Sequence, residues 1–509
     1  MGYERCNTVY LYHYMFLLPL IITVIVLWVL LERGNTSLAR ITLTDMAIIA
    51  YLLHGLCNLM FTRDTPPDSL ALCHWGMYTI LYIVTRNVAN KLLVTWLIIG
   101  IGITQAIIGI TQLAGWFPSN HPDFPVTGTF QNPGPYGGLL AVSLIAIAWV
   151  LRSGARLKAF PWGVLLLLLV MLVISTSRAA WIAALVGIVT LFPRLHDGWG
   201  KRTIISIITG AFVVGLYFLR PGSADARILI WQVCARLIKL EPLTGLGIGT
   251  LPQHYMNAQA EYFAAHPDSD LSIVANNNYQ AFNEFLHITV EQGFIGLLLL
   301  FGIILTCRHS SRFPFILTWF TFSMFSYPAD CEWLMIVFVL SLALCAGENP
   351  GWCLKFNKKW FLCSLVMIPF TLATTLRYDN AVKNIKFDTA PQFPYNREYM
   401  LQFARQKRDI HVLERLTRDV CSSTDILCDM GDLYETRGDI KRADSCYSLA
   451  RQMVPCRIKP LHKLYLLYKQ RNSTVAEDYA RQILNFKTPF VGSVVLRARA
   501  DAKKFLNHE

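Results

Sequence analysis

The chain has 509 residues, of which 54% are hydrophobic and 16% charged, and its mean hydropathy is +0.40. The apolar residues stand in long blocks, which excludes a string of ordinary soluble domains. Much of the formal net charge of +13 falls in the short connections between blocks, where contact with anionic membrane lipid explains it. We therefore expect a polytopic membrane protein with no nucleic-acid partner.

Twelve segments are apolar enough to be expected to cross a bilayer, which takes about 20 residues per helix. They lie near residues 10–31, 41–62, 69–85, 92–115, 134–151, 160–177, 179–193, 203–219, 287–306, 313–327, 333–347 and 359–377. No small-residue cleavage site follows the first segment, so we expect it to be retained as a span. The expected fold class is all-α: a membrane bundle of about 12 transmembrane helices, followed by a helical-repeat domain.

Lysine and arginine are concentrated in alternate connections. The basic connections carry Arg33, Arg40, Arg86, Lys91, Arg152, Arg156, Lys158, Arg194, Lys201, Arg202, Arg308, Arg312, Lys355, Lys358 and Lys359. Other connections, such as 116–133 and 328–332, have neither residue. Basic loops stay in the cytoplasm. The N-terminus, the long loop 220–286 and the tail after Arg377 are therefore expected on the outer side.

The composition turns polar and charged after Tyr378, which predicts a membrane domain at 1–378, including the loop 220–286, and a second domain at 379–509. One unit of the second domain matches the tetratricopeptide pattern. Its matching residues are Leu427, Met430, Gly431, Tyr434, Gly438, Ala443, Tyr447, Ala450 and Pro455. A following unit is weaker, because Ala476 and Ala480 are out of phase. A generic helical hairpin is the alternative; repeats would offer a surface to a protein partner or an acceptor.

Cysteine does not indicate a metal site, because the 13 cysteines show no ligand spacing. Cys421, Cys428, Cys446 and Cys456 fall in the second domain, where disulfides are chemically possible if that domain is external. Four cysteines allow three pairings, and the spacing does not choose among them. The chain also lacks a phosphate-binding glycine loop and a nucleophile elbow, so an ATP-driven pump is disfavoured and no cofactor is expected.

Two arginines are candidates for a binding site, because charge near a membrane is costly and is often functional. Arg178 lies in Ser-Thr-Ser-Arg-Ala-Ala-Trp, where the chain turns on the outer side. Arg227 lies in the amphipathic stretch 225–240 and shares a helix face with Trp231, four residues later. Each could be an ordinary interfacial or solvated arginine. Together, two guanidinium groups could bind a diphosphate.

A stretch rich in Gly and Pro, 126–138, enters the next span and contains Asn132. Non-helical backbone at membrane depth is tolerated only where it is packed in protein or lines a polar cavity. A plain structural turn is the alternative.

The start of the ninth span carries Asn283, Glu284, His287 and Glu291. The last three are three and four residues apart, which places them on one helix face. A carboxylate or imidazole there could act as a general base. A favourable acid at a helix start would explain Glu284, although not the whole cluster.

In this order, the elements resemble those of the O-antigen ligase and polymerase superfamily of bacterial envelope glycosyltransferases. The matching stretches are 128–133, Ser177-Arg178 with Trp181, Arg227 with Trp231, 245–249 and 283–296, and together they cover about residues 90–306. The resemblance implies transfer from an undecaprenyl-diphosphate-linked glycan at the outer face of the inner membrane. It implies lipid A core, another glycan or a protein hydroxyl as the acceptor, and no metal.

The resemblance also assigns residues. It implies that Arg178 and Arg227 hold the diphosphate, in a substrate site that includes Asn132, Asn283 and Trp231. Neither a metal nor a nucleotide is required for such a transfer.

At one position the chain departs from the family. Ligases have a histidine, their proposed base, immediately before the Asn of the Asn-x-Phe/Tyr-Leu motif, and this chain has Phe282 there. Glu284 or His287 could take the role, or His254 or His266 from the loop. A repeat-unit polymerase is the alternative activity. A non-enzymatic glycan transporter or assembly scaffold is the alternative of another class, although no internal symmetry supports a transporter.

Overall fold

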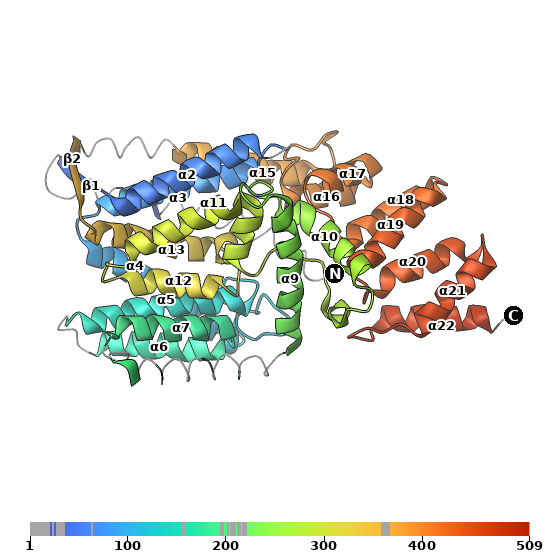
Figure 1. Ribbon diagram of the computed structural model, residues 1–509, viewed down its shortest axis with the longest axis horizontal. Helices are drawn as coiled ribbons and strands as arrows, with labels where there is room; N and C mark the ends of the chain where they lie inside the picture. The colour runs from blue at the N-terminus through green and yellow to red at the C-terminus, as the bar shows by residue number, and fades with distance from the viewer. Residues whose placement is uncertain are drawn as a thin grey trace.

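The computed structural model describes residues 21–22, 25–26, 36–62, 65–154, 159–193, 198–200, 203, 210, 215, 221–357 and 367–507. The spans expected near 10–31 and 203–219 fall almost wholly outside these residues, as does the first part of the span expected at 359–377. Throughout the described residues the regular structure is helical, apart from one pair of short strands (Figure 1).

Nine apolar helices of the described part run roughly along one direction and form a bundle (Figure 1). They are α2 (Leu43–Phe61), α3 (Ser69–Asn87), α4 (Lys91–Leu113), α5 (Pro133–Arg152), α6 (Phe160–Ile174), α7 (Arg178–Leu191), α11 (Glu284–Cys307), α12 (Phe313–Ser323) and α13 (Glu332–Glu348). Each overlaps an expected span. Within the described residues, α2, α4, α5 and α11 are long and apolar enough to cross a membrane, so the number of about 12 remains a prediction.

Helix α5 is the centre of the bundle and packs against α4, α6, α7 and α12. Its residues from Pro135 to Ile147 are almost continuously buried. A Cβ atom at Gly138 would lie 2.6 Å from the ring of Phe322 in α12, so only a glycine allows the two helices to approach this closely. The tight packing of α5 fixes the position of its first turn, which contributes to the candidate site.

The strand pair closes one end of the bundle. Strand β1 (Thr36–Thr42) pairs antiparallel with β2 (Gly351–Asn357), and Thr42 then caps α2 (Figure 1). The sequence analysis did not predict these strands, because they form only when segments far apart in the chain meet.

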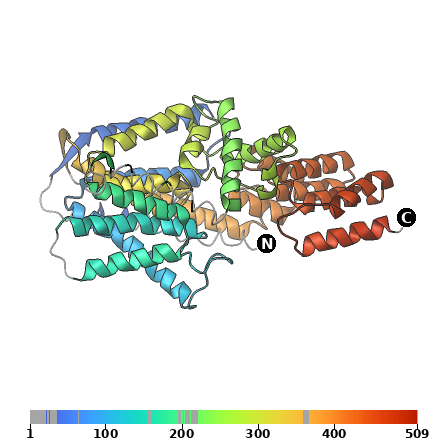
Figure 2. The ribbon, with the colours of Figure 1, turned by 60° about the horizontal axis from the view of Figure 1, so that its bottom comes forward.

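Basic residues of the predicted cytoplasmic loops gather at this same end. Arg86 forms an ion pair with Asp45 at 3.4 Å, and Arg312 forms one with Glu348. Arg152 donates a hydrogen bond to a main-chain carbonyl at the end of α7. The long loop and the C-terminal helices lie at the opposite end of the bundle, as both ribbon views show (Figures 1 and 2). The assignment of these ends to the two sides of a membrane remains a prediction.

The long loop is folded. It contains α9 (Pro221–Leu240), α10 (Leu251–Ala265) and the short η2 (Asp270–Val274), which confirms the amphipathic helix expected at 225–240. Helix α9 lies crosswise over the end of the bundle (Figure 1). Several of its apolar residues, including Leu229 and Val233, are buried, whereas Ile228 and Leu240 are exposed.

The tail is a series of packed helices. They are α15 (Met367–Asn384), α16 (Arg397–Lys407), α17 (Ile410–Asp419), α18 (Thr424–Thr436), α19 (Ile440–Met453), α20 (Ile458–Lys469), α21 (Ser473–Leu484) and α22 (Ser493–Leu506). Helices α18 and α19 pack closely because Gly431 leaves room for the ring of Tyr447. Ala476 and Ala480 are fully buried, although they are out of phase with the tetratricopeptide pattern. The tetratricopeptide assignment remains a prediction.

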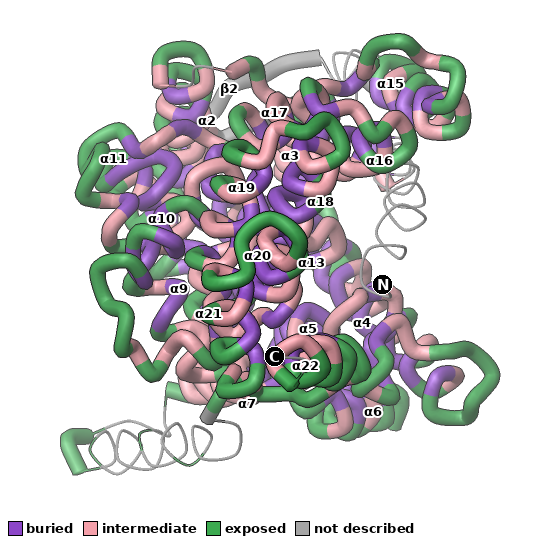
Figure 3. The backbone as a smooth tube through the Cα atoms, turned by 90° about the vertical axis from the view of Figure 1, so that its right-hand side faces the viewer, coloured by how far each residue is buried: buried purple, intermediate pink, exposed green. Residues whose placement is uncertain are grey.

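The tail and the long loop share one hydrophobic core. Buried residues of α9 and α10, such as Val233 and Tyr255, belong to the same cluster as Met400, Leu427 and Tyr447 of the tail. Figure 3 views the molecule from this end, with the C-terminal helices in front of the bundle. The tail therefore packs on the long loop through this shared core.

Cysteines of the tail are free thiols in the structure. Cys421 and Cys428 are buried, and Cys446 and Cys456 are partly exposed.

Candidate functional site

The first arginine lies at a strained turn. Thr176 has a φ of +53°, in the left-handed region, and Arg178 begins α7 two residues later. The hydroxyl of Ser177 donates to the carbonyl oxygen of Gly134 at 3.4 Å. A Cβ atom at Gly137 would lie only 2.6 Å from Ser177 Cβ. The turn before α7 is therefore packed directly against the start of α5.

Asn132, the second predicted element, lies at this start of α5. Its side-chain oxygen accepts a hydrogen bond from Gly134 N at 2.8 Å and caps the helix. The preceding non-helical backbone is held by α4: Gln112 Oε1 accepts from the amides of Thr127 and Gly128 at 2.9 and 2.8 Å. The polar backbone is thus satisfied by side chains of a neighbouring helix, as a re-entrant segment requires.

Arg227 of α9 is the second arginine. Its Nη1 donates to the carbonyl and hydroxyl oxygens of Ser223 at 3.1 and 3.0 Å, and its guanidinium lies 5.7 Å from the ring centroid of Phe282. Burial lowers the pKa of Arg227, and the positive charge of Arg178 lowers that pKa further. Arg178 and Arg227, far apart in sequence, are therefore electrostatic neighbours.

Two buried N–H groups at this place lack a hydrogen-bond partner among the described residues. One is Arg227 Nε, and the other is Trp231 Nε1, one helical turn further along α9. The Trp231 ring lies 6.4 Å from that of Phe325, centroid to centroid, so it faces the end of α12. Buried donors without partners are costly, and they are available to an anionic or polar ligand.

Phe282 occupies the position of the family's histidine. Its φ is +50°, and its ring packs edge-on against Tyr327 at 5.1 Å. The next residue, Asn283, caps α11 by accepting hydrogen bonds from two amides of its first turn, at 3.0 and 3.1 Å. Phe282 is thus placed between Arg227 and Tyr327.

The sequence analysis missed Tyr327, Phe325 and Asp330, which lie between α12 and α13. Asp330 accepts a hydrogen bond from Gln280 Nε2 at 2.9 Å. The only available signal was the acidic composition of 328–332, which did not single out a residue.

A row of titratable groups lines the first turns of α11. Glu284 Oε1 accepts from the amide of Ala329 at 2.9 Å. His287 lies between two carboxylates: its Nε2 is 3.1 Å from Glu291 Oε1, and its Nδ1 is 3.9 Å from Glu284 Oε2. All three side chains are largely buried, so the cluster can hold and pass a proton.

The loop histidines have other surroundings. His266 ends α10, stacks on Tyr262 at 4.7 Å and contacts Arg236 at 3.3 Å. His254 lies within α10. Neither residue lines the cavity described below.

The glycine-rich turn 245–249 packs against a break in α11. Gly293 has φ +66° and ψ −172°, which interrupts the helix. Because of this break, the main-chain carbonyls of Glu291 and Gln292 are accessible to groups outside the helix. Gly247 N donates to Glu291 O at 2.9 Å, and His54 Nε2 lies 3.2 Å from Gln292 O. The break therefore binds the loop to the bundle at the level of the buried Glu291.

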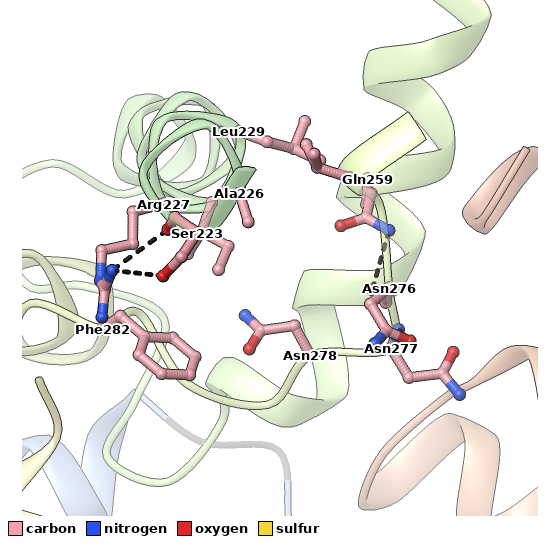
Figure 4. Close-up of a pocket in the computed structure, with 11 residues that line it drawn as sticks. Ser223, Ala226, Arg227, Leu229, Gln259, Asn276, Asn277, Asn278 and Phe282 are labelled. Carbon is pink, nitrogen blue, oxygen red and sulfur yellow. Dashed lines mark hydrogen bonds between the residues drawn. The ribbon is translucent and has the colours of Figure 1, made fainter. Parts of the chain in front are cut away.

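A cavity of about 250 Å³ opens beside Arg227 (Figure 4). One side is formed by α9 and Phe282, and the other by Gln259 of α10 and the asparagines 276–278. Figure 4 shows Arg227 and Phe282 next to each other, across the cavity from Gln259 and Asn276.

Comparison with known proteins finds a match in the part of the chain that contains this site. Residues 163–301 match the family model described as O-Antigen ligase, a stretch that holds Arg178, Arg227, Phe282 and the acid–histidine row. No curated protein matches the chain. The region from 163 to 301 thus supports the O-antigen ligase superfamily as the one that this protein resembles.

Proposed function

We propose that the protein transfers a glycan from an undecaprenyl-diphosphate-linked donor to an acceptor hydroxyl, on lipid A core or on a protein. The transfer takes place at the outer face of the bacterial inner membrane. The observation that carries the proposal is the buried Arg227, whose pKa is lowered by the positive charge of Arg178 and whose Nε has no hydrogen-bond partner among the described residues. Two like charges in a partly buried place repel each other, so a doubly charged anion between them would stabilise the arrangement.

The arginines act on the leaving group. The acceptor oxygen attacks C1 of the first sugar, the bond between C1 and the diphosphate oxygen breaks, and undecaprenyl diphosphate leaves with the electron pair. Arg178 and Arg227 stabilise the negative charge that develops on the diphosphate. The N–H of Trp231, which is buried and has no partner in the described part of the chain, is available to the same anion.

The proton of the acceptor hydroxyl passes to the acid–histidine row. Glu284 or His287 accepts it, and Glu291 holds His287 in place through the 3.1 Å contact. Phe282 cannot accept a proton, so the base must come from another side chain than in the ligases. His287→Gln and Glu284→Gln should each lower kcat, and the variant that lacks the base should lose the acidic limb of the pH–rate profile.

Activity in cells tests the proposal. We expect a strain without this gene to accumulate the lipid-linked donor and to lose a glycan from its lipopolysaccharide or from an envelope protein. Arg178→Ala and Arg227→Ala should each remove at least ~2 kcal/mol of transition-state stabilisation, roughly a thirtyfold loss of activity. Lysine should restore only part of it, because an ammonium lacks the bidentate fork.

The matched control is Arg236→Ala, which removes an arginine of α9 that stacks on Tyr262 at 5.2 Å and is not part of the cavity lining. The double variant of Arg178 and Arg227 should be little worse than the worse single variant. Full activity of Arg227→Ala in a correctly inserted protein would refute the proposal and favour the scaffold. Shortened glycan chains, with attachment intact, would indicate a repeat-unit polymerase.

A further inference from the structure

We propose that the cavity beside Arg227 binds the sugar that the donor's diphosphate carries. This inference rests on the proposed function and adds a sugar subsite to it. Arg227 forms part of the cavity wall, so a ring in the cavity would be directly linked to a diphosphate held at Arg227. The remaining argument concerns which chemistry the cavity fits.

The lining combines amides with apolar groups. Gln259, Asn276 and Asn278 supply side-chain amides, each with donor and acceptor atoms, while Phe282 and Leu229 supply apolar surface. A sugar ring has hydroxyl groups around its rim and C–H groups on its faces, so it needs both. A polyprenyl chain has no hydrogen-bonding groups to offer to this polar wall, so it matches the lining less well than a sugar does.

The amide wall is held rigidly from behind. Gln259 Nε2 donates to the main-chain carbonyls of Asn276 and Met453, at 3.2 and 2.6 Å. Asn277 Oδ1 accepts from the amide of Thr424 at 3.1 Å, and Arg457 donates to Asn276 Oδ1 at 2.7 Å. Three of these bonds come from the C-terminal helices or go to them.

A wall fixed in this way loses little entropy when a ligand binds, which favours selective recognition. The size of the cavity, about 250 Å³, limits the inference to the sugar next to the diphosphate. Sugars further along the glycan would lie outside it.

Native mass spectrometry of the full-length protein in detergent would test the sugar site. The probes are undecaprenyl diphosphate alone and the lipid-linked glycan pool extracted from a strain that lacks this gene. Bound masses identify the sugar, so its identity need not be known beforehand. Wild-type protein should retain the glycan-linked form at least about tenfold better than the bare diphosphate.

Two variants and two matched controls sharpen the test. Ala226→Leu fills the cavity from α9, and Ala235→Leu adds the same bulk at an exposed position of that helix. Asn278→Ala removes an amide of the wall, and Asn257→Ala removes an exposed one from α10. The first member of each pair should abolish the preference for the glycan-linked form and leave binding of the bare diphosphate unchanged.

The outcomes separate this inference from the proposed function. If both cavity variants keep the wild-type preference, the sugar site is refuted and the diphosphate site is untouched. If Arg227→Ala binds undecaprenyl diphosphate as well as the wild-type protein does, the diphosphate site of the proposed function is refuted. If Asn257→Ala and Ala235→Leu lose the preference as well, the effect is not specific to the cavity, and the inference is again refuted.

Discussion

Replacing Gly293 with alanine should break the contact that fixes the candidate site. Gly293 has φ +66° and ψ −172°, a conformation adopted almost only by glycine. A Cβ atom there would lie 2.0 Å from Leu243 O and 2.2 Å from Leu243 C. These are main-chain atoms, so no side-chain rotation can relieve the overlap, and the loop must move away from α11.

The magnitude follows from these two effects. The backbone conformation alone costs a non-glycine residue about 1–3 kcal/mol. Displacement of the loop also weakens the bond from Gly247 N to Glu291 O, which adds about 1 kcal/mol. We therefore expect a loss of roughly 3 kcal/mol or more. For a chain of this size that corresponds to a fall of about 3 °C in the apparent melting temperature.

The control is Gly302→Ala in the same helix, where an added Cβ atom has no neighbour within 4 Å. Thermal unfolding of both variants in detergent should be compared at one scan rate, because unfolding of such proteins is often irreversible. Gly293→Ala should also lose most of its glycan-transfer activity, since Glu291 and His287 lie at the displaced contact. Equal melting temperatures and equal activities in the two variants would refute the reasoning.

Two further predictions concern the tail and the topology. Arg457→Ala should lower the affinity for the glycan-linked donor about five- to tenfold, because it removes a hydrogen bond that holds the cavity wall. The control is Arg442→Ala, which breaks a surface ion pair elsewhere in the tail and should leave the affinity unchanged. Equal effects of the two variants would argue against a coupling between the tail and the cavity. Cysteines introduced at Asp268 and Asp478, in a protein whose exposed native cysteines are replaced, should react with an impermeant reagent in cells whose outer membrane alone is permeabilised. A requirement for permeabilising the inner membrane at either position would show that the orientation is wrong.

Much of the helical architecture follows from the sequence. Apolar blocks predict spans because a bilayer leaves no other way to satisfy the backbone, and nine described helices lie in expected spans. The amphipathic pattern of residues 225–240 predicted the helix of the long loop. Asn132 and Asn283, which the sequence offered as substrate-site residues, cap α5 and α11 in the structure by accepting hydrogen bonds from amides within a few residues. These signals are local, so one sequence is sufficient to read them.

Only the tertiary structure decided which of these elements meet. The sequence offered Arg178 and Arg227 as candidates, and the charge of Arg178 lowers the pKa of Arg227 only because α9 lies across the end of the bundle. Tyr327 had no signal, because its role depends on contact with Phe282 from another segment. The packing of the tail on the long loop, through one shared cluster of buried residues, also had no signal in the sequence. Such contacts depend on the shape and burial of surfaces distant in sequence, and no local pattern of residues records them.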